Sequence, residues 1–304
     1  MERMNPVKLE NVNCEICGKR ETTILFKARD YCHELPGEFN VSRCSNCGLA
    51  YLNPRPTKEG MEVYYPEGYA PHKRMGGVGD IRFQQRLLGF FIKFHGGELR
   101  TLWRLKPGKI LDVGCGGGMY LKALKERGWT VYGVDASAVA TQRARALGLN
   151  NIFTGELHEA RHPDNLFDAI LMRHSLEHMP HPSETLAEVH RILRPGGAVL
   201  IVAPNFQSTE ARLFKQHWYQ IDAPRHFYFL EHSTIRNLLH KHNFRITTYS
   251  FSSRPFSSFV KSITYGTTSK VIKRLLDNTI SYIISHVIFW PWHRDTSMVV
   301  LAKK

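Results

Sequence analysis

The sequence predicts an α/β fold built around a parallel sheet. The first observation is an apolar strand (110–113) that leads through a glycine-rich turn into a helix (119–127) and a second strand (130–134). A βαβ unit of this kind implies that its two strands are parallel. Strand and helix patterns keep alternating beyond this unit, and a hydrophobic content of 42% is ample for one large core.

A small module is expected at residues 1–56. It carries two Cys-x-x-Cys-Gly motifs, Cys14 with Cys17 and Cys44 with Cys47. The glycine after each pair permits a tight turn that directs both thiolates at one ion, and tetrahedral zinc is the expected occupant. Because four thiolates leave no open coordination position, this Zn²⁺ should be structural. Redox-active or disulfide-bonded cysteines are the alternative, which a reducing cytosol disfavours.

Residues 57–105 are expected to connect this module to the main domain. Tyr64 and Tyr65 either pack against the module or contact a substrate. The glycine-rich stretch 72–80 indicates a linker or lid, and the apolar spacing over 81–105 predicts a helical lead-in to the main domain.

Residues 106–304 contain the rest of the predicted sheet. Beyond the βαβ unit we expect strands at 151–154, 167–172, 198–203, 245–251 and 298–302, which makes seven strands in all. Three further helices are expected: one capped by Ser137, one that ends at residues 194–197, and one over 230–244. An insertion, residues 252–296, separates the last two strands.

The insertion is predicted to contain an amphipathic helix at 270–292. Apolar residues recur there at helical spacing, with three basic residues near the start and two tryptophans near the end. Such a helix either lies in a membrane interface or packs on the domain or in a homodimer. Its apolar stretch is too short to cross a bilayer, which takes about 20 residues, and no secretory pattern begins the chain. A cytoplasmic location, or a peripheral one at the inner membrane surface, is therefore expected.

The glycine-rich turn indicates a nucleoside site. Without a Cβ, Gly114 and Gly116 would let the backbone pass close to a ligand. Asp135 follows the second strand, where such units place a carboxylate for the ribose diol. The turn matches neither a dinucleotide-binding sequence, because Met119 stands where the last glycine belongs, nor a phosphate-binding loop. Asp112, which precedes the turn, suits a ligand with a cationic amino group.

Residues 112–118, followed by residues 133–135, resemble the cofactor loop of the class I S-adenosylmethionine-dependent methyltransferases. The resemblance implies a Rossmann-like fold with a seven-stranded sheet. It also implies that Gly114 and Gly116 border S-adenosylmethionine and that Asp135 holds its ribose. Similar enzymes with an amino-terminal zinc ribbon belong to polysaccharide and natural-product pathways.

The carboxyl ends of parallel strands face the ligand cleft, so Arg173, at the end of the fourth strand, is expected beside the cofactor. The resemblance implies that Glu156 flanks the adenine; a solvent-facing charge is the alternative. Two histidines are candidates for the general base of a methyl transfer to a hydroxyl, because the pKa of histidine lies near working pH. His226, which Asp222 would orient, is preferred over His178, and a structural role for both is the alternative.

Other polar residues adjoin these histidines. Arg225, beside His226, is expected to bind an acidic group of the substrate. The pair Glu177-His178 resembles a divalent-metal site of some quinone-pathway methyltransferases. Because His174 stands where that pattern has an acid, no catalytic metal is expected.

These features predict a methyltransferase that acts on a sugar, a glycan or a related small molecule, nucleotide-linked or lipid-linked, with O-methylation favoured over C-methylation. A ribosomal RNA methyltransferase is the alternative, since some RNA guanine methyltransferases carry an amino-terminal zinc module and the net charge of +14 suits a polyanion. Against it, the fourth strand lacks the Asn-Pro-Pro-aromatic sequence common in base-amino methyltransferases, and the basic excess lies in the insertion. A non-catalytic scaffold that binds the cofactor only structurally is the third possibility.

Overall fold

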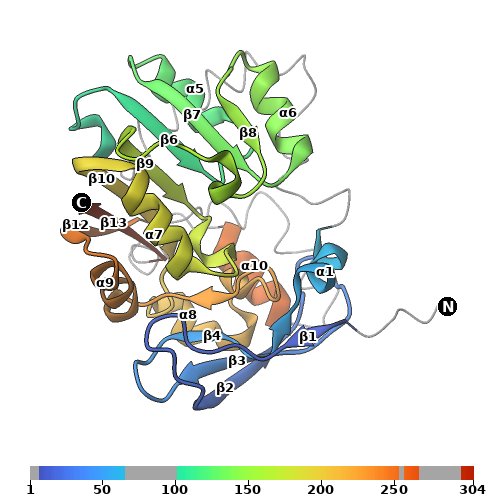
Figure 1. Ribbon diagram of the computed structural model, residues 1–304. Coiled ribbons are helices and arrows are strands. Elements are labelled where there is room, and N and C mark those ends of the chain that lie inside the picture. The colour runs from blue at the N-terminus through green and yellow to red at the C-terminus, as the bar shows by residue number, and fades with distance from the viewer. Residues whose placement is uncertain (1–6, 66–100, 253–256, 267–295) are drawn as a thin grey trace, which may run out of the picture.

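The computed structural model describes residues 7–65, 101–252, 257–266 and 296–304. Its main sheet has seven strands in the order β12-β13-β10-β9-β6-β7-β8 (Figure 1). They are β6 (Lys109–Val113), β7 (Thr130–Asp135), β8 (Ile152–Thr154), β9 (Phe167–Arg173), β10 (Leu193–Pro204), β12 (Arg245–Ser252) and β13 (Ser297–Lys303). Pairing is parallel from β8 to β10, whereas β13 is antiparallel to both β10 and β12. The predicted α/β class and seven-stranded sheet are confirmed.

Helices cover both faces of this sheet. Among the described residues, helices that do so include α5 (Met119–Lys125), α6 (Ala138–Ala146), α7 (Pro182–Ile192) and α9 (His232–Lys241). Successive residues of a strand point to opposite faces. Ile110 of β6 therefore packs in the core that includes Leu121 of α5. The adjacent Leu111 belongs to the opposite core, which includes Leu186 of α7.

The main departure from the predicted boundaries lies at the end of α7. The helix stops at Ile192, and β10 begins at once with Leu193 rather than with Ala198. The register between β10 and β9 shifts between Leu193 and Ala198. Residues 194–197, which were expected only to end the helix, are thus an irregular part of the strand.

The N-terminal module contains a four-stranded antiparallel sheet in the order β11-β4-β3-β2 (Figure 1). The module itself supplies β2 (Thr22–Ala28), β3 (Phe39–Cys44) and β4 (Ala50–Leu52), but β11 (Tyr228–Phe229) belongs to the connection between β10 and α9. Tyr228 pairs with Tyr51, and Phe229 pairs with Ala50. The module and the main domain therefore share a sheet, which the sequence did not predict.

The remaining elements are short. They are β1 (Leu9–Glu10), β5 (Arg55–Pro56), α1 (Lys58–Met61), η1 (Glu62–Tyr64), η3 (Leu157–Ala160), η4 (Leu176–His178), α8 (Thr209–Phe214), η5 (Lys215–His217), η6 (Tyr219–Ile221) and α10 (Ser257–Gly266). The predicted linker at 72–80, most of the helical lead-in at 81–105 and the amphipathic segment 270–292 lie outside the described residues. In the part of the chain that is described, no helix combines the length and the apolar character needed to cross a membrane.

Candidate active site

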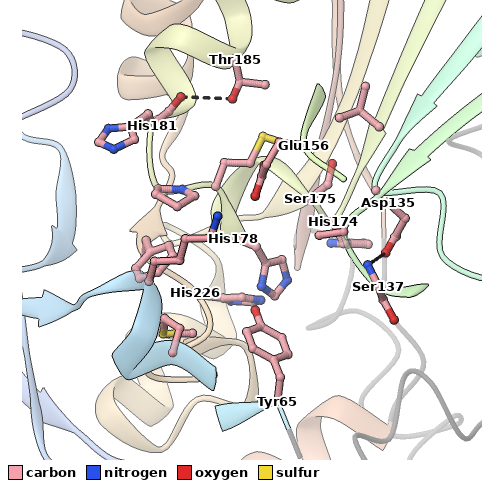
Figure 2. A pocket seen from close by; sticks show the side chains of 18 of the residues that line it. Tyr65, Asp135, Ser137, Glu156, His174, Ser175, His178, His181, Thr185 and His226 are labelled. Carbon is pink, nitrogen blue, oxygen red and sulfur yellow. Dashed lines mark hydrogen bonds between the residues drawn. The ribbon is translucent and has the colours of Figure 1, made fainter. Parts of the chain in front are cut away.

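A cleft of about 1470 Å³ opens at the carboxyl ends of β6, β7 and β9. One side is formed by the glycine-rich turn and by residues that follow these strands; the other is formed by the N-terminal module and by residues 219–227, here named the histidine loop. Figure 2 shows Asp135 at one end of the cleft and His181 at the other, with His178 and His226 between them.

Asp135 closes β7 and faces the glycine-rich turn. Its Oδ2 accepts a hydrogen bond from the backbone N–H of Gly116 at 2.8 Å, and its Oδ1 accepts one from Ser137 at 2.9 Å (Figure 2). Ser137 in turn caps α6, because its hydroxyl accepts from the N–H of Ala140 at 3.2 Å. Each carboxylate oxygen retains a second lone pair, so Asp135 can accept further hydrogen bonds from a ligand.

The two glycines of the turn differ in what surrounds them. Both have positive φ, 81° at Gly114 and 52° at Gly116. A Cβ on Gly114 would lie 2.7 Å from the Cβ of Ser175, whereas a Cβ on Gly116 would have no described atom within 4 Å. Gly116 therefore leaves space open, as expected for close approach of a ligand. Gly114 lines the cleft, and the contact with Ser175 by itself requires that this position has no side chain.

Asp112 lies in the sheet at the base of the turn and is only 4% exposed. Burial raises the pKa of its carboxyl to about 7, although the positive charge of Arg173 acts in the opposite direction. Within the described residues, Oδ1 of Asp112 has no hydrogen-bond partner. A buried carboxylate oxygen without a donor fits the amino group of S-adenosylmethionine.

Arg173 and Glu156 both line the cleft, as expected. The guanidinium of Arg173 lies over the ring of Tyr120, 4.2 Å from its centroid. Glu156 is exposed and caps η3 through a reciprocal pair of hydrogen bonds with Glu159. Glu156 therefore caps a helix and also lines the cleft.

His178 and His226 are held in the same tautomer by the backbone. Nδ1 of His178 lies 3.0 Å from the carbonyl oxygen of Arg225, and Nδ1 of His226 lies 2.8 Å from that of Gln220. Because a carbonyl oxygen can only accept, each Nδ1 carries the hydrogen. In the neutral rings Nε2 therefore keeps its lone pair. The sequence placed both histidines at the cleft but did not predict their tautomers.

Asp222 adjoins His226, as expected. Its Oδ2 lies 4.0 Å from Nε2 of His226, and its Oδ1 accepts two hydrogen bonds from the guanidinium of Arg225, at 2.6 and 3.1 Å. Burial would raise the pKa of Asp222, but the positive charges of Arg225 and His226 outweigh it and lower the pKa. Asp222 is therefore a carboxylate at neutral pH and stabilises positive charge on His226.

Arg225 does not bind substrate as expected, because its side chain is fully buried. It forms a bidentate ion pair with Asp30 of the N-terminal module, at 2.7 and 2.8 Å, in addition to its bonds with Asp222. Burial alone would lower the pKa of Arg225, but the carboxylates of Asp30 and Asp222 raise it. The expectation that Arg225 grips an acidic substrate was wrong because the sequence did not reveal Asp30 as its partner.

Glu177 brings a carboxylate to the two histidines. Donor atoms of Glu177, His178 and His226 all lie within 4.8 Å of one another, a spacing that a divalent cation could bridge. His174 is engaged with the same carboxylate, since its Nδ1 lies 3.4 Å from Oε1 of Glu177. The sequence suggested the Glu177-His178 pair, but it did not show that His226 would join it.

The four predicted cysteine ligands form a compact cluster. Their sulfur atoms all lie within 4.8 Å of one another, and Cys14 Sγ is 3.3 Å from Cys47 Sγ. Each pair sits on a tight turn closed by its glycine: the N–H of Gly18 donates to the carbonyl of Cys14 at 2.7 Å, and Gly48 repeats this bond in the second motif. Burial raises the pKa of the Cys14 thiol. Four sulfur donors at this spacing can hold a metal ion, whose charge would stabilise the thiolate form.

Tyr65 is a cleft residue for which the sequence left two roles open. Tyr64 is fully buried and donates its hydroxyl to the carbonyl of Pro36 at 2.6 Å, so it packs against the module. The next residue, Tyr65, lines the cleft, and Figure 2 shows its hydroxyl directed toward His226. Substrate contact by Tyr65 stays a prediction, and no local signal in the sequence distinguished the two tyrosines.

A family model described as "Methyltransferase domain" matches residues 84–249, more than half of the 304 residues. The chain belongs to this family. The match spans the glycine-rich turn, the end of β9 and the histidine loop.

Curated relatives of this methyltransferase include proteins named "Ubiquinone biosynthesis O-methyltransferase". The protein from Azoarcus sp. (strain BH72) is 37% identical over 120 residues, 37% of this chain and 48% of the relative. The one from Klebsiella pneumoniae subsp. pneumoniae is 36% identical over 131 residues, 36% of this chain and 54% of the relative. The chain spans about half the length of the curated relatives it matches.

Solved structures with a similar fold include two methyltransferases of low sequence identity. A SAM-dependent methyltransferase from Archaeoglobus fulgidus is 20% identical, with a TM-score of 0.47, over 73% of this chain and 94% of that one. An S-adenosylmethionine-dependent methyltransferase from Mesorhizobium loti is 19% identical, with a TM-score of 0.48, over 68% and 95%.

Proposed function

We propose that this methyltransferase transfers a methyl group to a hydroxyl of a sugar, a glycan or a related small molecule, with His226 as general base. The observation that carries the proposal is that both histidines line the cleft and donate Nδ1–H to a backbone carbonyl. In the neutral ring, Nε2 of each histidine therefore has no hydrogen. A histidine in this form can accept the proton that an attacking hydroxyl must lose.

The residues of the cleft divide into two groups. On the cofactor side, Asp135 would hold the ribose and Asp112 the amino group, while Gly116 leaves space for the ligand. Bound there, S-adenosylmethionine supplies a methyl group activated by its positive sulfur. On the acceptor side, His226 would take the hydroxyl proton, and Asp222 would stabilise the resulting imidazolium.

The charge of the cleft supports a small acceptor rather than RNA. Among the described lining residues, seven are Asp or Glu and four are Lys or Arg, although the whole chain carries a net charge of +14. Arg55 and Glu10, both lining residues, are ion-paired at 2.8 Å, which leaves six acidic and three basic residues. A polyanion would be repelled by such a cleft, whereas the hydroxyls of a sugar can donate to its carboxylates.

The cysteine cluster is proposed to hold a structural Zn²⁺ through Cys14, Cys17, Cys44 and Cys47. Four sulfur donors within 4.8 Å of one another suit the tetrahedral geometry of zinc. Because four thiolates would fill its coordination shell, the ion would stabilise the module rather than take part in methyl transfer.

The test is incubation with methyl-labelled S-adenosylmethionine and a panel of free sugars, sugar nucleotides, lipid-linked glycans, phenols and ribosomal RNA. Label in an ether of a sugar or glycan, formed at the same rate across a range of salt concentrations, is expected. Label found only in RNA, with a steep dependence on salt, would overturn the proposal. Label found only in a phenol would retain O-methylation but replace the acceptor class.

A further inference from the structure

We infer that Arg225 and Asp30 are positioning residues, through which the N-terminal module sets the orientation of both candidate bases. The inference rests on the proposed function. It starts from the surroundings of the Arg225 side chain, which is 0% exposed. Hydrogen bonds of its guanidinium go to Asp222, to Asp30 of the module and to the carbonyl of Tyr64, which follows the module.

Arg225 reaches both histidines by separate routes. Its backbone carbonyl accepts the hydrogen of Nδ1 of His178 at 3.0 Å. Its guanidinium holds the Asp222 carboxylate, whose other oxygen lies 4.0 Å from Nε2 of His226. A displacement of Arg225 would therefore disturb the tautomer of one histidine and the electrostatic partner of the other.

Asp30 is the residue that fixes Arg225, and it is itself fixed. Its Oδ1 accepts hydrogen bonds from the N–H groups of Cys32 and His33, both at 3.0 Å, and its side chain is fully buried. A bidentate pair between such a carboxylate and a guanidinium has one preferred geometry. The module thus places the guanidinium before any substrate binds.

The charges of this cluster suit a proton acceptor. Asp30 and Asp222 carry two negative charges and Arg225 carries one positive charge, so these three residues have a surplus of one negative charge beside His226. The carboxylate of Glu177 lies within 4.8 Å of the same ring, and a proton taken up by His226 would offset part of this negative charge. If Asp30 were uncharged, Arg225 would offset Asp222 alone, and this surplus would be lost.

The test compares Asp30→Asn with wild type, and uses Glu38→Gln as the matched control. Glu38 is a carboxylate of the same module that pairs with Lys27 and Arg29 at the surface. In Asp30→Asn we expect kcat to fall roughly 10- to 100-fold, with the Kd for S-adenosylmethionine and the metal content unchanged. The control should keep the wild-type kcat. Wild-type kcat in a folded Asp30→Asn protein would overturn the inference.

A second readout needs no substrate. In long-range ¹H–¹⁵N spectra of the wild type, both histidines should show a protonated Nδ1 and an unprotonated Nε2. In Asp30→Asn, His178 should become a mixture of tautomers, and an unchanged spectrum would overturn the inference. If Asp30→Asn does not fold, Asp30→Glu replaces it, since this variant keeps the charge but displaces Arg225, and the same outcomes apply. Because the spectra are independent of the acceptor, failure to find a hydroxyl substrate would leave this test intact.

Discussion

His178 and His226 meet edge to face, with ring centroids 4.4 Å apart and ring planes inclined by 80°. They come from different parts of the chain, η4 and the histidine loop, yet each is held at Nδ1 by a backbone carbonyl. Both therefore offer the same nitrogen to the cleft. Asp222 of the histidine loop lies 4.0 Å from that nitrogen of His226.

His226→Ala should lower kcat by about 10²- to 10⁴-fold, because a general base contributes on that order, and His178→Ala should lower it less. Neither change should alter the Kd for S-adenosylmethionine measured by calorimetry. His240→Ala, at an exposed position of α9, serves as the control and should leave kcat unchanged. Full turnover in His226→Ala would remove the preferred assignment of the base.

Asp135→Ala should weaken S-adenosylmethionine binding by roughly 10- to 100-fold, which corresponds to the loss of hydrogen bonds to a charged group. The change also removes the two bonds from Gly116 and Ser137 that hold the turn. Calorimetry with S-adenosylmethionine gives the measurement. Asp164→Ala, an exposed acid paired with Arg191, is the control. Equal affinity in both variants would mean that the cofactor lies elsewhere.

Asp112→Asn should stabilise the cofactor-free protein at neutral pH. Burial raises the pKa of Asp112 from 3.8 to about 7 in the folded state, so folding favours the protonated acid. This favourable contribution is complete below about pH 4 and is lost as the pH rises through 7. The asparagine variant has no charge to lose, and its advantage in unfolding free energy should grow to roughly 2–4 kcal/mol above pH 7.

Urea denaturation without cofactor at several pH values between about 4.5 and 8 measures this difference. Asp164→Asn, whose carboxylate is exposed, should show no comparable trend. A constant gap between Asp112→Asn and wild type over the whole range would show that Asp112 stays ionised in the folded protein.

One zinc ion per chain is expected by elemental analysis, and it should disappear in Cys17→Ser. Activity should fall with the zinc content, because the sheet of the module includes β11 and so continues into the residues beside His226. Cys32→Ser changes an exposed cysteine of the same module outside the cluster and should keep the metal. Metal-free protein with normal turnover would contradict this coupling.

Turnover should not depend on an added divalent cation. If His226 is the base, EDTA treatment that leaves the thiolate-bound zinc in place should not change kcat. Glu177, His178 and His226 are close enough to share a cation. A loss of turnover that Mg²⁺ or Mn²⁺ restores would therefore assign this cluster to metal binding, and His226 could not then act as the base.

The sequence predicted the features that depend on neighbouring residues. The βαβ unit was evident because an apolar strand, positive-φ glycines and an amphipathic helix follow one another between Lys109 and Asp135. The cysteine cluster was evident from two pairs with matched spacing. Ser137 was correctly identified as the cap of α6, since this interaction spans only three residues.

Features that depend on distant pairs were not predicted. Asp30 and Arg225 are far apart in sequence, and nothing local marks either as the partner of the other. Arg225 therefore appeared to be available for substrate. The pairing of β11 with β4 was missed for the same reason, because a two-residue strand has no periodicity of its own. The direction of Tyr65 depends on how the module sits against the histidine loop, which only the assembled fold determines.

The strand β11 also limits where the N-terminal module can be separated from the main domain. A cut after residue 56 would separate Tyr51 from Tyr228 and leave the edge of β4 open to pairing with other chains. It would also remove Asp30, the carboxylate of the module that pairs with Arg225. A transplant of the N-terminal module onto another enzyme would have to include the histidine loop and β11.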